Sequence, residues 1–99
     1  MIQEIATITV VNGSEAQFEA AVASSIELFR RAQGCRDFRL ERCVEDPATY
    51  LLIVGWETVA SHDIDFRQSE DFQEWRRRVS PFFAKSPTVA HSAVVFRGF

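Results

Sequence analysis

The sequence has little of what marks specialised protein classes. It contains only two cysteines, Cys35 and Cys43, and no CxxC motif or cysteine–histidine spacing typical of a metal site. If both lie on one strand, eight residues at about 3.3 Å each separate them by roughly 26 Å, which is too far for a disulfide. We therefore expect reduced thiols and no bound metal.

Long apolar runs and excess positive charge are also missing. No apolar run approaches the roughly 20 residues that a membrane helix needs. The first residues, MIQEIATITV, lack the basic start and cleavage site of a signal peptide. The net charge is −3, which disfavours non-specific binding to phosphate backbones. These absences predict a cytoplasmic protein that binds neither membranes nor nucleic acid.

Apolar residues are plentiful, at 46% of the 99 residues. A chain of this size and composition can form one domain around one core. We therefore expect a single domain over residues 1–99, with its core at about residues 4–96.

Hydrophobic periodicity predicts the order strand, helix, strand, strand, helix, strand. The first strand covers residues 4–11 and ends at the turn signal Asn12-Gly13, and helical spacing then runs from Ser14 to Gly34. The later elements are strands at 35–44, 49–56 and 88–96, a short helix at 58–66, and a longer helix that starts at Ser69 and bends or stops near Pro81. This βαββαβ order predicts a ferredoxin-like α+β sandwich with an antiparallel sheet, in which the first and third strands are central.

The strand at 49–56 is apolar on both faces. Alternation places Tyr50, Leu52, Val54 and Trp56 on one face and Leu51 and Ile53 on the other. One helix layer covers only one face of an antiparallel sheet, and so short a chain has no spare segment for the second face. The pattern therefore favours a homodimer in which a second copy covers the second sheet face.

Several motifs resemble, in order and spacing, the antibiotic biosynthesis monooxygenase (ABM) domain. They are Gly34-Cys35 followed by Phe38, Glu45-Asp46-Pro47, the apolar strand ending in Trp56-Glu57, Ser69 followed by Phe72, and Val89 followed by His91. The resemblance extends from about Glu4 to Phe96. It implies a dimeric α+β barrel, with two sheets face to face and a cavity in each subunit between sheet and helices.

The same resemblance implies an activity. Characterised relatives oxidise phenolic or quinol-type polycyclic compounds with O₂ and use no metal or flavin, so a small aromatic ligand and no cofactor are expected. Another branch of the family degrades haem with a histidine in the second-half helix. Residues 70–83 contain no histidine, which disfavours haem degradation. In the polyketide-oxidising enzymes a tryptophan that ends the third strand contacts the substrate, and Trp56 matches it.

A cofactor-free oxygenase must first form an electron-rich anion, because triplet O₂ reacts poorly with closed-shell molecules. This step needs a base with a pKa near neutrality and donors that stabilise the anion. His62 is the first candidate for the base, helped by His91 in the last strand. Arg67 or Arg76 would hold the anion. The aromatic residues expected to line a cavity for a flat substrate are Phe66, Phe72 and Trp75.

Each candidate also has an ordinary structural interpretation. His62 fits a helix-surface histidine, His91 fits a core or interface residue, and the two arginines fit snorkelling side chains. Asp63 and Asp65 are interpreted as solvated or capping groups. A non-enzymatic dimer that binds a ligand or is associated with stress would have the same fold, and the size and lining of the cavity distinguish it. RNA-binding domains share the strand order, but residues 4–11 lack the aromatic side chains that those domains expose.

Overall fold

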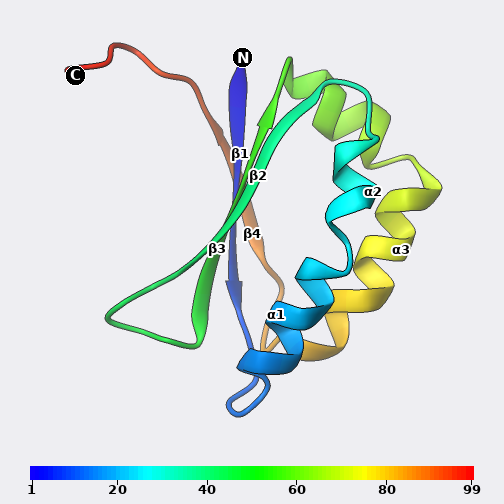
Figure 1. The fold of residues 1–99 in the computed structure, drawn as a ribbon, viewed down its shortest axis with the longest axis vertical. Coiled ribbons are helices and arrows are strands. Elements are labelled where there is room, and N and C mark those ends of the chain that lie inside the picture. Colours follow the sequence, from blue (N-terminus) through cyan, green and yellow to red (C-terminus); the bar gives the residue numbers. More distant parts are fainter.

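One antiparallel sheet of four strands carries a helical layer on one of its faces (Figure 1). The computed structural model describes residues 1–99. The strands are β1 (Ile2–Thr9), β2 (Cys35–Arg42), β3 (Thr49–Trp56) and β4 (Thr88–Ser92), in the spatial order β2-β3-β1-β4. This is the ferredoxin-like α+β order, so the prediction of the fold and of two central strands, β1 and β3, is confirmed.

The helical layer has more breaks than the sequence pattern predicts. Its elements are α1 (Glu15–Ala23), α2 (Ile26–Arg30), a short π-helix η1 (Ser61–Phe66), α3 (Glu70–Val79) and a 3₁₀ turn η2 (Ser80–Phe82). The helix expected from Ser14 to Gly34 is interrupted at Ser24 and Ser25, whose hydroxyls both donate to the carbonyl of Ala21 at 2.8 Å. Such side-chain bonds compete with the backbone ladder and shorten helices. No helix combines the length and apolar character needed to cross a membrane.

The expected helix start at Ser69 is confirmed, whereas the expected helix end at Gly34 is wrong, because α2 already ends at Arg30 and Gly34 lies in the turn that leads to β2. Gly34 has a φ of +83°, which favours glycine, and a Cβ there would lie only 2.6 Å from the hydroxyl of Ser61. The Ser69 hydroxyl accepts a hydrogen bond from the backbone N–H of Phe72 at 3.2 Å and so caps α3. Gly34 therefore allows the chain before β2 to pass close to the start of η1.

The last strand is shorter than expected. β4 ends at Ser92, which pairs with Gln3, so residues 93–96 of the predicted strand are not paired with β1. The remaining tail leads away from the sheet (Figure 1) and exposes Val94, Val95 and Phe96.

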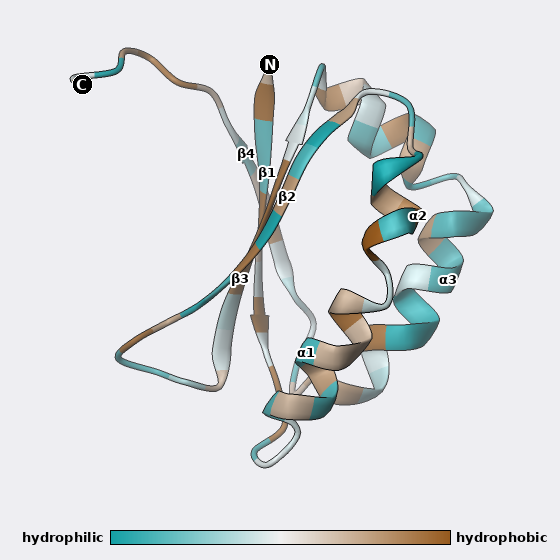
Figure 2. Cartoon of the chain, in the orientation of Figure 1, coloured by the Kyte–Doolittle hydropathy of each residue, from teal (hydrophilic) through white to brown (hydrophobic).

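The core lies between the sheet and the helices. β1 alternates so that Glu4, Ala6 and Ile8 face the helices and are buried. Figure 2 shows apolar segments along the central strands, whereas α3 is largely hydrophilic. On the opposite face of the sheet, Ile5 pairs with Ile53 and with Ala90, and no element of this chain lies over them (Figure 1).

Candidate functional site

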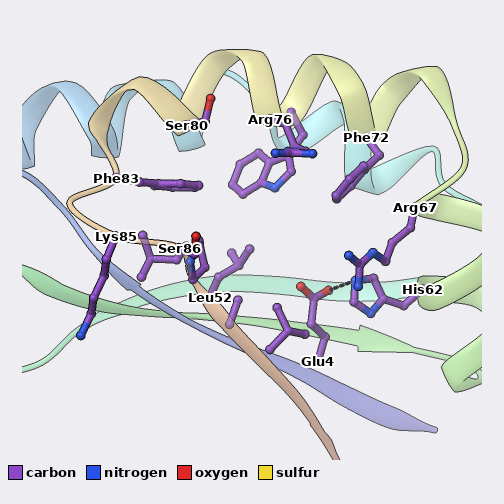
Figure 3. Close-up of a pocket in the computed structure, with 15 residues that line it drawn as sticks. Glu4, Leu52, His62, Arg67, Phe72, Arg76, Ser80, Phe83, Lys85 and Ser86 are labelled. Atoms are coloured by element: carbon purple, nitrogen blue, oxygen red, sulfur yellow. Dashed lines mark ion pairs between the residues drawn. The ribbon is translucent and has the colours of Figure 1, made fainter.

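A cavity of about 380 Å³ lies between α3 and the sheet (Figure 3). The sheet side is formed by Glu4, Ala6, Ile8, Leu52 and Val89. The helix side and the two ends are formed by His62, Arg67, Phe72, Trp75, Arg76, Ser80, Phe83, Lys85, Ser86 and Pro87. Its size falls within the range of small-molecule sites, and its walls combine aromatic rings with a few polar groups.

Glu4 is the buried titratable residue of the cavity that the sequence analysis did not single out, and Lys85 was not singled out either. The alternation of β1 turns its side chain inward, where it is only 5% exposed. The indole N–H of Trp56 donates to Oε1 of Glu4 at 3.0 Å, and Nε2 of His62 lies 3.3 Å from the same oxygen. Burial raises the pKa of Glu4 to about 7, because the hydrogen bond from Trp56 and the charge of Arg67 only partly offset the lost hydration. A carboxyl with this pKa is partly ionised at neutral pH.

His62 is buried on η1 and stacks on the indole of Trp56, with ring centroids 5.4 Å apart. Its Nδ1 lies 2.9 Å from Nε2 of His91. Burial, and to a smaller extent the proximity of His91, lower the pKa of His62 to about 4. The ring is therefore neutral at neutral pH, with one nitrogen that donates and one that accepts.

His91 lies beside Glu4 on the helix-facing side of the sheet, since the two are Cα partners in the β1–β4 register. Its side chain is 22% exposed and meets the His62 ring edge-on, with centroids 5.1 Å apart. It does not line the cavity but contacts a residue that does. Glu4, His62 and His91 thus form a connected row from the cavity wall to the surface.

The other predicted site residues fall into two groups. Arg67, Phe72, Trp75 and Arg76 all line the cavity.

Trp56 and Phe66 do not line the cavity. Both are buried, at 0% and 3% exposure, and their rings pack against each other with centroids 5.3 Å apart. His62 stacks on Trp56 from η1 and covers it. Trp56 therefore reaches the cavity only indirectly, through its hydrogen bond to Glu4.

His62, Asp63 and His91 are the residues whose donor atoms come close enough to share a metal ion, within 4.8 Å of one another. The two histidines are already hydrogen-bonded to each other. The guanidinium of Arg67 lies 3.8 Å from the same oxygen of Asp63 that faces them, and its charge opposes a bound cation. We interpret the group as a histidine pair with a solvated carboxylate.

The family model for "Antibiotic biosynthesis monooxygenase" matches residues 1–78. The uncharacterised protein YczJ of Bacillus subtilis is 34% identical over 91 residues, which cover 92% of this chain and 96% of the relative. Among solved structures, a candidate antibiotic biosynthesis monooxygenase from Bordetella bronchiseptica is 54% identical, with 96% of this chain and 97% of that chain covered and a TM-score of 0.95.

A more distant structure shares the fold. SnoaB of Streptomyces nogalater, a cofactor-independent oxygenase crystallised as a point mutant, has a TM-score of 0.83 at 16% identity, with 98% of this chain and 95% of that chain covered. The family match covers most of the chain, and the similarity to the Bordetella structure extends over nearly all of it. The protein therefore belongs to the antibiotic biosynthesis monooxygenase family.

Proposed function

We propose that this protein oxidises a small phenolic or quinol-type aromatic compound with O₂, without a metal or organic cofactor, and that Glu4 is its general base. The observation that carries the proposal is a buried carboxyl at the wall of a cavity with aromatic sides. Family membership and the fold shared with a cofactor-independent oxygenase support the same reaction class.

The acid–base properties of the row favour Glu4 over His62 as the base. A general base works best when its pKa lies near the operating pH. Glu4 has a pKa of about 7, whereas His62, with a pKa of about 4, is a weak base at neutral pH. In this proposal His62 and His91 position the Glu4 carboxylate, and the indole N–H of Trp56 holds the same oxygen.

The reaction requires the protein only to accept a proton from the substrate and to return it later. Glu4 removes a proton from a CH₂ group that is conjugated with a carbonyl through aromatic rings, as in the keto form of a polycyclic phenol, and this gives an enolate. The enolate donates electrons to O₂ and forms a peroxide at that carbon, which takes the proton back from Glu4 to become a hydroperoxide. Loss of water then converts the CH₂ group and O₂ into a carbonyl group and one water. Arg67 is suited to stabilise the enolate oxygen because it lines the cavity and its charge acts on Glu4.

The cavity bears on the non-enzymatic alternative. A volume of about 380 Å³ is enough for a bicyclic ligand, and His62 and Glu4 both face it. Phe72, Trp75 and Phe83 supply flat apolar surfaces for an aromatic ring. These features favour an enzyme over a passive binding module.

We also propose that the protein acts as a homodimer joined through the sheet face opposite the helices. Ile5, Leu51 and Ile53 lie on that face in adjacent paired positions of β1 and β3. Apolar side chains at the centre of a sheet face that no element of the chain covers favour association.

The test is O₂ uptake with anthrone, whose CH₂ group lies next to aromatic rings and opposite a carbonyl, with an enzyme-free blank for autoxidation. We expect one O₂ consumed per quinone formed and a rate that rises with a midpoint near pH 7, as Glu4 ionises. Glu4→Gln should lower the rate at least 100-fold, in line with the loss of a general base. The control Glu70→Gln, an exposed position in the first turn of α3, should retain the wild-type rate. Ligand binding without O₂ consumption would refute the proposal and support the binding module.

A further inference from the structure

The charge of the cavity differs from that of the whole chain. The protein carries a net charge of −3. The cavity lining nevertheless has three cations, Arg67, Arg76 and Lys85, and a single carboxyl, Glu4. A concave site with walls of one charge sign concentrates ligands of the opposite sign.

Arg76 has no carboxylate partner, and its position on α3 explains why. Side chains three or four residues apart are neighbours on a helix. Arg77 and Arg78 both pair with Glu74 in this way, the latter at 2.7 Å. Four residues before and after Arg76 lie Phe72 and Ser80, and all three line the cavity. The helix therefore presents Arg76 along its cavity-facing edge, where no acidic side chain neutralises it.

Lys85 lies in the segment between η2 and β4 and also lacks a carboxylate partner, whereas Arg67 has Asp63 at 3.8 Å. Figure 3 shows Lys85 at the opposite end of the cavity from Arg67 and His62, with Ser80 and Ser86 also at that end. Arg76 reaches down from the helical layer between the two ends (Figure 3). The cations thus extend along the cavity, away from the proposed base.

We propose that the cavity binds an aromatic ligand that carries an acidic substituent, such as a carboxylate, and that Arg76 and Lys85 recognise this substituent. The inference specifies the substrate class of the proposed oxygenase and rests on the same cavity. Arg76 supplies a planar guanidinium that can hold a carboxylate with two hydrogen bonds. Lys85 adds positive charge at its end of the cavity, and the hydroxyl of Ser86 supplies a further donor. Arg67 remains free to act on the reacting part of the ligand near Glu4.

The test compares two ligands of matched shape, a naphthalene carboxylate and the corresponding uncharged carboxamide. Their affinities for the wild-type protein are measured by calorimetry at pH 7.5 and low salt. We expect the carboxylate to bind at least about tenfold more tightly, because hydrogen bonds to a charged group are stronger than neutral ones. Arg76→Gln should remove most of the preference for the carboxylate and leave the affinity for the carboxamide within about twofold of the wild type. The double variant Arg76→Gln, Lys85→Gln should remove the preference for the carboxylate entirely.

Arg77→Gln is the matched control, since Arg77 is the next residue on α3 and is paired with Glu74 outside the cavity. It should bind both ligands as the wild type does. Equal affinity for the two ligands, failure to bind either, or an equal loss in the control would overturn the inference. The binding test can fail while the proposed oxygenase activity holds, because that activity is measured separately, by O₂ uptake with uncharged anthrone.

Discussion

The most direct physical test of the site concerns the ionisation of Glu4 and its effect on stability. Folding transfers this carboxyl from water to a position only 5% exposed and raises its pKa from 4.5 to about 7. Between these two values the unfolded chain has lost the proton and the folded chain still holds it. The stability associated with Glu4 is therefore fully present below pH 4.5 and declines as the pH rises to 7.

The size of this decline follows from the same two values. Each pH unit between them corresponds to about 1.4 kcal/mol, so the wild type should lose about 3 kcal/mol of unfolding free energy through Glu4 alone. Glu4→Gln removes the titration but keeps a carbonyl oxygen that can accept the hydrogen bond from the indole N–H of Trp56. The variant should therefore gain about 3 kcal/mol relative to the wild type between pH 4.5 and pH 8.

The assay is urea denaturation followed by circular dichroism at several pH values, with protein concentration held constant because association alters apparent stability. The quantity of interest is the difference between the two unfolding free energies. Titration of groups distant from Glu4 is common to both proteins and largely cancels. Glu70→Gln, at an exposed position, should show no such pH-dependent difference. If the curves of Glu4→Gln and the wild type run parallel over this pH range, Glu4 ionises as an ordinary carboxyl and the argument for a tuned base fails.

Two further predictions address the support of the site and its assembly. Gly34→Ala should lower stability more than Gly13→Ala does, because both glycines have a positive φ but only at Gly34 would a Cβ meet another residue, the hydroxyl of Ser61 at 2.6 Å. Thermal unfolding of the two variants measures the difference, expected at about 1–3 kcal/mol, and equal losses would contradict the tight approach of η1. Ile53→Asp should convert the proposed dimer to monomer in analytical ultracentrifugation, whereas Val44→Asp, at a position 87% exposed, should leave the dimer intact. A monomeric wild-type protein would rule out the dimer.

The fold could be predicted from local sequence because its signals are local. β1 alternates inward and outward residues, β3 is apolar on both faces, and Ser69 caps α3 through its own hydroxyl. The expected bounds of β3, Thr49–Trp56, are those of the structure. The predicted bounds of the first helix and of the last strand were wrong. The hydroxyls of Ser24 and Ser25 interrupt the helix predicted from Ser14, and β4 ends at Ser92 although Ile2 of β1 lies beyond its partner Gln3.

The site could be predicted only in part, because its geometry depends on residues far apart in the chain. Phe72 and Arg76 were both named as site residues from the sequence, and both line the cavity, because four residues along a helix bring side chains to the same face. The inward register of Glu4 was readable from the alternation of β1, but a lone glutamate in a strand gives no sign of what surrounds it. Its pKa depends on burial beneath η1 and α3 and on the indole of Trp56, which is 52 residues away.

Residue types and their immediate neighbours were enough to define the order of the strands, the apolar faces and the positions where helices begin. The packed chain was needed to establish that His62 contacts His91, and that Trp56 contacts Glu4 and not the cavity. It was also needed to establish which arginines of α3 meet a carboxylate and which one faces the cavity. Burial, desolvation and charge pairing depend on all neighbours in space, and a chain pattern specifies only neighbours in sequence.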